Sequence, residues 1–108
     1  MLRIKAGATG ARLSGLRVEI LAALMVAVSV YDSAKCDLLL TCGTDSKHMA
    51  TSLHYVGLAI DIALPNAVPV EVSAIKQALE WALGDDYDLV VEEDHWHIEF
   101  QPKRGVNL

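Results

Sequence analysis

The sequence predicts a small α+β domain, in which a mainly antiparallel sheet carries helices on one face and leaves a cleft on the other. Three observations favour this fold class. The chain has 108 residues, 53% of them hydrophobic, which suits one domain spanning 1–108 with one core and argues against disorder. Two stretches have the apolar spacing of helices. The other apolar runs are short, and several alternate with a period of two and end near Pro, Gly, Asn or Asp.

The first elements are a short edge strand and a long helix. Leu2 and Ile4 suit the strand, and Ser14 is a suitable N-cap for a helix from about 16 to 34. Residues 20–30 are uniformly apolar, but a membrane span needs about 20 such residues. The run also lies too deep in the chain, and lacks a small-residue cleavage site, to be a signal peptide. We therefore expect a heavily buried core helix and no membrane span.

Two strands follow, separated by a polar segment. Residues 38–41 predict a short buried strand, 42–48 a polar loop, and 58–64 a second strand that Pro65 stops. On the second strand Asp61 shares a face with alanines, whose small side chains leave room above it. Gly57 lets the backbone turn sharply where the loop enters this strand.

The last third of the chain predicts a helix and a hairpin. Pro69 suits the first turn of a helix over 70–83, within which Trp81 is expected in the core rather than as a substrate platform. Strands over 87–92 and 95–101 flank a tight turn. On the second of these strands the two faces separate cleanly. The core face carries Trp96, Ile98 and Phe100, and the open face carries His95, His97 and Glu99.

Charge and cysteine content limit the classes of partner and site. The net charge of −5 argues against nucleic acid as a partner and gives no steering towards an anionic cell surface. An extended segment between Cys36 and Cys42 would hold their Cα atoms too far apart for a disulfide, so we interpret both as buried thiols. With no second cysteine pair, Cys₄ and Cys₂His₂ zinc sites are excluded.

His54, Asp61 and His97 are the candidate metal ligands. Pairing of the 95–101 strand with the 58–64 strand would bring Asp61 and His97 together on the open face. Two imidazoles, one carboxylate and a vacant fourth position have the composition of a catalytic zinc site. Taken alone, His54 would be interpreted as a surface loop histidine, Asp61 as a strand-end carboxylate and His97 as a partly buried histidine. The metal-site prediction therefore depends on the three residues together.

These motifs resemble a known peptidase family. Ser52-x-His54-x-x-Gly57-x-Ala59-x-Asp61 followed by Asp94-x-x-His97 resembles the zinc D-alanyl-D-alanine carboxypeptidases and L-alanyl-D-glutamate endopeptidases, which include many phage endolysins. The likeness covers roughly 38–101. It implies the fold shared with the hedgehog signalling domain, a zinc cleft, and Zn²⁺ held by His54, Asp61 and His97.

The resemblance also implies two catalytic residues. Asp94, three residues before the last ligand, would take a proton from the metal-bound water and later deliver it to the leaving amine. Simple alternation puts Asp94 on the wrong face, so it must lie in the hairpin turn, with Glu93 and Glu92 as fallback candidates. His95 would stabilise the transition state beside the metal, although a rival role as ligand and a role as an ordinary turn histidine remain open.

Substrate contacts are less well defined. Ser52 matches the family serine and would orient the loop or the substrate, unless it is a simple turn residue. Many relatives carry an upstream arginine for the substrate carboxylate, but the segment 38–54 has none. Lys47 or His48 would substitute, or Arg12 or Arg17 would fold over the site.

The expected function is therefore hydrolysis of a peptidoglycan stem peptide, at L-Ala–D-Glu or D-Ala–D-Ala, by a monomeric phage or prophage lysis enzyme. Without a visible signal peptide, such an enzyme would be made in the cytoplasm and reach the wall through a holin pore. The alternative is a non-catalytic, zinc-stabilised hedgehog-like module that binds the wall or a protein.

Overall fold

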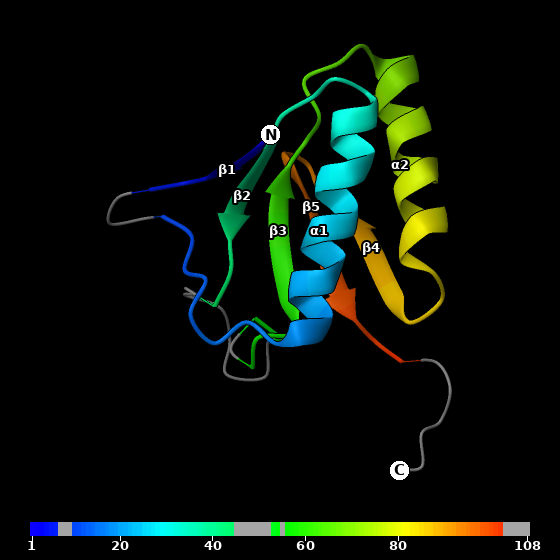
Figure 1. Ribbon diagram of the computed structural model, residues 1–108. Helices are drawn as coiled ribbons and strands as arrows, with labels where there is room; N and C mark the ends of the chain where they lie inside the picture. The colour runs from blue at the N-terminus through cyan, green and yellow to red at the C-terminus, as the bar shows by residue number, and fades with distance from the viewer. Residues whose placement is uncertain (7–9, 45–52, 55, 103–108) are drawn as a thin grey trace.

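The protein has the predicted α+β fold, with two helices against one face of a five-stranded mixed sheet (Figure 1). The structure is a computed structural model of residues 1–108 and describes all of them except 7–9, 45–52, 55 and 103–108. The elements in chain order are β1 (Leu2–Ile4), α1 (Val18–Ser33), β2 (Leu38–Cys42), β3 (Ala59–Ala63), α2 (Pro69–Leu83), β4 (Tyr87–Val91) and β5 (His95–Phe100).

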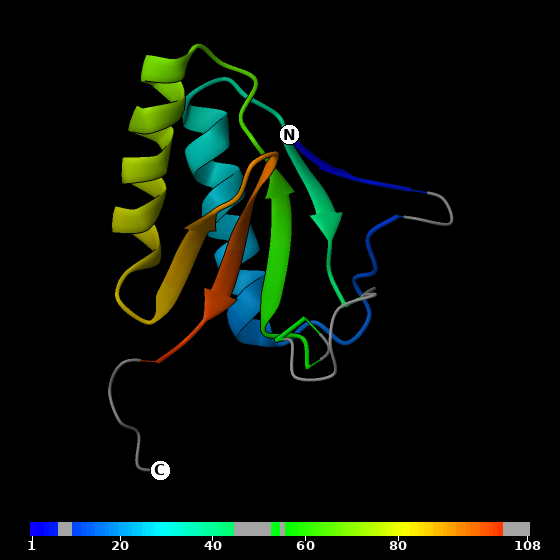
Figure 2. The same cartoon turned by 180° about the vertical axis from the view of Figure 1, so that it is seen from behind.

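The strands lie in the order β1-β2-β3-β5-β4, and only the β1–β2 pair is parallel. Both helices cover the same side of this sheet, and the opposite side, seen in Figure 2, carries no helix of the described chain. β3 therefore lies at the centre of the sheet, paired with β2 on one side and β5 on the other. This uncovered side is the face on which the sequence predicted the cleft.

The core lies between the helices and the sheet. Burial of apolar side chains on folding is the main favourable term for such a layer. Its fully buried large members come from α1, α2 and the three strands β2, β3 and β5: Ile20, Tyr31, Leu38, Leu40, Ile60, Ile62, Leu79, Trp96 and Ile98. The Tyr31 hydroxyl donates a hydrogen bond to the Ala63 carbonyl (2.9 Å), which ties α1 to the end of β3.

Two predictions about the helices are wrong. Ser14 is not the N-cap of α1, because Arg17 takes that position without a side-chain cap, and its N–H bonds the Gly57 carbonyl instead (2.9 Å). Trp81 is not in the core, since it is 89% exposed on α2. The expected heavy burial of α1 holds for one side of the helix only, because Val18 and Met25 are exposed.

The predicted pairing of β3 with β5 is confirmed, and Asp61 lies directly opposite His97. Its neighbours on the open face pair as expected from a period of two: Ala63 with His95 and Ala59 with Glu99. The small alanines thus leave space for the larger side chains across from them. β4 and β5 form a hairpin whose turn contains Asp94, as the sequence required.

A β-bulge interrupts the pairing of β2 with β3. Leu40 lies opposite Ile62 and Cys42 opposite Asp61, so two residues of β2 span one step of β3. Alternation from Leu38 and Leu40 would direct Cys42 into the core, but the extra residue redirects it. Cys42 consequently faces the imidazole of His54 and is only partly buried. No helix of the described chain is long and apolar enough to cross a bilayer.

Candidate metal centre

Asp61 is the central residue of the candidate site. It lies in the middle of β3, retains only 7% exposure, and carries a carboxylate contacted by imidazoles from two sides. A buried carboxylate is costly unless it is paired. Here Oδ1 lies 3.3 Å from His54 Nε2 and 2.9 Å from His97 Nδ1. The predicted ligands therefore meet at one carboxylate oxygen.

His54 reaches this position from the turn before β3. Its side chain is 2% exposed, and its Nδ1–H donates to the Gly43 carbonyl at 2.9 Å, because a carbonyl can only accept. That bond orients the ring and leaves Nε2 as the nitrogen that faces Asp61. The turn itself depends on Gly57, which has a φ of +77°. A Cβ added to Gly57 would lie 2.0 Å from the Gly15 carbonyl oxygen.

His97 is held in the complementary way from β5. Its Nε2–H donates to the Glu99 carboxylate at 2.8 Å, and Gln101 Nε2 donates to the other oxygen of that carboxylate at 2.8 Å. Nδ1 of His97 consequently points towards Asp61 and lies 3.2 Å from His54 Nε2. A histidine whose outer nitrogen bonds a carboxylate is the common arrangement around protein-bound zinc.

The three inner atoms have separations that suit one small cation. His54 Nε2, Asp61 Oδ1 and His97 Nδ1 lie 2.9–3.3 Å from one another. Ligand atoms about 2.0–2.1 Å from one tetrahedral zinc would be about 3.3 Å apart. Two imidazole nitrogens and a carboxylate oxygen are also a donor set that zinc accepts. The residues present therefore fit the ion that the sequence predicted.

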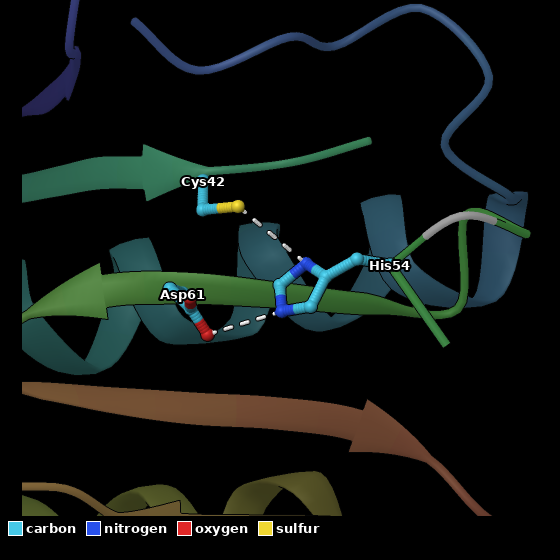
Figure 3. A group of neighbouring side chains, drawn as sticks. All are labelled: Cys42, His54 and Asp61. Carbon is cyan, nitrogen blue, oxygen red and sulfur yellow. Dashed lines mark hydrogen bonds and ion pairs between the residues drawn. The ribbon is translucent and has the colours of Figure 1, made fainter. Parts of the chain in front are cut away.

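Cys42 adds a donor that the sequence did not suggest. Cys42, His54 and Asp61 offer ligand atoms within 4.8 Å of one another, close enough to hold a metal ion. Figure 3 shows the imidazole of His54 turned towards both of the other side chains, with Asp61 facing one ring nitrogen and the thiol facing the other. Asp61 is on the Nε2 side, and Cys42 Sγ lies 3.7 Å from Nδ1. Cys42 and Cys36 form no disulfide, as predicted, but only Cys36 is buried, so the predicted burial of Cys42 is wrong. The sequence contains no sign of this contact, because it depends on the bulge in β2, which a period of two does not predict.

His95 and Asp94 extend the group towards solvent. His95 Nε2 lies 3.8 Å from Asp61 Oδ2, and its Nδ1 lies 2.7 Å from an oxygen of Asp94. The Asp94 side chain is 87% exposed and contacts His95 rather than Asp61. The predicted pair of catalytic residues thus forms a chain leading from the turn to the carboxylate of Asp61.

Charge interactions shift the pKa values of this group. Burial alone would raise the pKa of Asp61, but hydrogen bonds from His54 and His97, with their positive charge, hold it well below its usual value. Burial lowers the pKa of His97, but Asp61 and Glu99 outweigh it and the pKa is raised. The hydrogen bond from His95 lowers the pKa of Asp94. The carboxylates of Asp61 and Asp94 are therefore ionised at neutral pH.

The predicted substrate contacts were Ser52, Lys47 and His48, with Arg12 and Arg17 as alternatives. Ser52, Lys47 and His48 lie outside the described residues. Arg17 bonds the Val56 carbonyl through Nε at 3.2 Å, so its guanidinium helps to hold the loop that carries His54. The other upstream candidate, Arg12, uses its backbone carbonyl to accept the N–H of Thr44 at 3.0 Å. A substrate role for any of these residues stays a prediction.

Comparison with protein-family models, curated proteins and solved structures gives no match to this chain. The family resemblance noted above therefore rests on the motif residues themselves.

Proposed function

We propose that the chain is a zinc-dependent peptidase that hydrolyses a bond of the peptidoglycan stem peptide, L-Ala–D-Glu or D-Ala–D-Ala, and that it belongs with the phage-type members of the family it resembles. The observation that carries this proposal is the convergence of His54 Nε2, Asp61 Oδ1 and His97 Nδ1 within 3.3 Å. Each histidine is anchored through its other nitrogen. Catalytic zinc sites have three protein ligands and keep the fourth position for a water or a substrate oxygen.

His54, Asp61 and His97 would hold the zinc. When bound, the ion acidifies a water molecule and polarises the scissile carbonyl. Asp94 is ionised at neutral pH, and its exposed carboxylate would serve as the proton acceptor and then as the proton donor to the leaving amine. His95, between Asp94 and Asp61, presents Nε2 towards the same space and would donate to the developing oxyanion.

The decisive experiment incubates the zinc-loaded protein with purified peptidoglycan and identifies the products by mass spectrometry. New L-Ala–D-Glu ends, or free D-Ala, would support the proposal and show which bond is cut. Metal analysis of the same sample must show bound zinc. No release from either bond by a zinc-loaded protein would overturn the peptidase and favour the zinc-stabilised binding module.

A substitution at the turn tests the role of Asp94. We expect Asp94→Ala to lower kcat at least 100-fold while zinc content stays unchanged, because general acid–base groups contribute about 10²–10⁴-fold. Glu93→Ala is the matched control, since it removes an exposed carboxylate from the same turn and should keep activity. Loss of zinc from Asp94→Ala would mean that Asp94 is a ligand and not the proton acceptor.

A further inference from the structure

The position of Cys42 has a consequence for the metal itself. The β2 bulge turns this side chain out of the core, and its thiol lies beside the His54 imidazole (Figure 3). Cys42, His54 and Asp61 together satisfy the distances of a three-donor metal group. His54 and Asp61 thus belong to two overlapping donor sets, one completed by His97 Nδ1 and the other by Cys42 Sγ.

We propose that Cys42 is a fourth protein ligand, which closes the site around a thiophilic divalent cation, Zn²⁺ or its analogues Co²⁺ and Cd²⁺, when no substrate is bound. This inference rests on the proposed metal site and adds a ligand to it. A thiolate with two imidazoles and a carboxylate favours these ions over Mg²⁺ or Ca²⁺, which prefer oxygen ligands alone. The thiol releases its proton to solvent when it binds the cation.

Coordination by Cys42 requires its thiol to move towards the ion. A sulfur at about 2.3 Å and a nitrogen at about 2.0 Å from one tetrahedral zinc would be about 3.6 Å apart. In the structure Cys42 Sγ is 3.7 Å from the Nδ1 of His54, and the Cys42/His54/Asp61 donor set spans no more than 4.8 Å. The thiol now lies on the Nδ1 side of the ring, so rotation of the Cys42 side chain must bring it to the Nε2 side, where Asp61 lies.

Coordination by Cys42 would change the state of the proposed enzyme. Four protein ligands make a closed site, whereas hydrolysis needs one open position. The thiolate would have to leave before a water or a substrate oxygen could bind there. Cys42 would therefore restrain the site in the absence of substrate.

Cobalt substitution tests the proposal directly, because a thiolate bound to Co²⁺ gives an intense near-ultraviolet charge-transfer band that imidazole and carboxylate ligands do not give. We expect this band in the Co²⁺-loaded wild-type protein and in Cys36→Ser, and its loss in Cys42→Ser. Cys36 is the matched control, because its buried thiol contacts the Ala34 and Asn66 carbonyls and lies outside the donor group. Visible d–d bands report whether cobalt remains bound in each variant.

Alkylation of the wild-type protein provides a second measurement that does not depend on the folding of a variant. Iodoacetamide should label Cys42 in the metal-free protein at least ten times faster than in the zinc-loaded protein, while Cys36 labels slowly in both. Mass spectrometry of the digested protein separates the two residues.

The outcomes separate this inference from the proposed function. Cobalt d–d bands without a charge-transfer band, together with no protection of Cys42 by zinc, would overturn the fourth ligand and leave the peptidase intact. A Cys42-dependent band in a protein that releases nothing from peptidoglycan would support the ligand and overturn the peptidase. A protein that takes up no cobalt and no zinc would overturn both.

Discussion

Each imidazole of the metal group is held by a contact on the nitrogen that faces away from Asp61. For His54 the contact is a backbone carbonyl, and for His97 it is the carboxylate of Glu99, itself bonded by Gln101. An ionised carboxylate raises the basicity of the imidazole and orients its ring, so Glu99 should contribute to zinc affinity without touching the ion.

Glu99→Ala is therefore expected to weaken zinc binding by about 10–100-fold, the usual effect of removing such an outer contact. Glu99→Gln keeps an acceptor for the His97 Nε2–H but loses the charge, so its zinc affinity should lie between those of Glu99→Ala and the wild type. Competition with a chromophoric chelator measures these affinities. Glu80→Ala is the control. It removes an exposed carboxylate that pairs with Lys76 on α2, outside the metal group. Equal affinities for all variants would contradict a role for Glu99 in positioning His97.

The same residues make the metal-free and zinc-loaded proteins respond differently to pH. His97 has a raised pKa, so its contribution to stability is fully present below its unfolded value of 6.5 and is lost as pH rises through the folded value. Asp61 has a lowered pKa, so its contribution is present above 3.8 and is lost as pH falls towards the folded value. The metal-free protein should therefore be most stable between these two unfolded values.

Zinc requires a neutral His97, so protons compete with the ion and its stabilising effect should grow as pH rises past the pKa of His97. Thermal melts from pH 4 to pH 8, in chelator and in excess zinc, measure the difference in Tm at each pH. The two curves should diverge towards high pH. A constant difference across this range would show that His97 is not a ligand.

At the scale of the element, the turn before β3 sets the position of His54. Gly57 has a positive φ, and a Cβ there would meet the carbonyl oxygen of Gly15 at 2.0 Å. Its own carbonyl accepts the N–H of Arg17 at the start of α1. The loop and the helix are therefore packed backbone against backbone, and the His54 side chain depends on that contact.

Gly57→Ala should lower the free energy of unfolding by roughly 2–5 kcal/mol, since it adds a steric clash to the cost of a left-handed backbone. It should also weaken zinc binding, because the loop must move. Gly84→Ala is the control, with a φ of +81° but nothing within 4 Å of an added Cβ. That variant should lose about 1–3 kcal/mol from strain alone and keep its zinc affinity. Chemical denaturation and zinc titration of both variants test the difference. Unchanged zinc affinity in Gly57→Ala would contradict the role of this turn.

The elements also show how far the sequence determines the site. A period of two was enough to predict the β3–β5 pairing and the meeting of Asp61 with His97, because the two faces of each strand differ clearly in polarity. The same rule failed for Cys42, because a bulge adds one residue that alternation does not count. Trp81 was misplaced because residue type outweighed position: it lies two residues after the buried Leu79, on the outward side of α2.

At the scale of the whole molecule, the candidate ligands join segments that are distant in the chain. His54 and His97 are 43 residues apart and Asp61 and His97 are 36 apart, yet their atoms lie within 3.2 Å and 2.9 Å. Cys42 belongs to the neighbouring strand, so a bound cation would link the three central strands β2, β3 and β5. The apolar core lies on the opposite side of the sheet, between the sheet and the helices, and does not include these ligands.

This separation predicts a folded metal-free protein. Because the core is independent of the site, removal of zinc should lower Tm without unfolding the chain, unlike the zinc-dependent folding of zinc fingers. At a zinc concentration 100 times Kd, binding stabilises by about 2.7 kcal/mol, which corresponds to a Tm shift on the order of 10 °C for a domain of this size. Circular dichroism melts in chelator and in zinc measure this shift. His54→Ala should melt at the same temperature in both conditions, because the zinc site then lacks one of its proposed ligands. A chain that loses its secondary structure at 25 °C in chelator would contradict the independence of the core. It would instead indicate that the cation is part of the fold, as in the zinc-stabilised module.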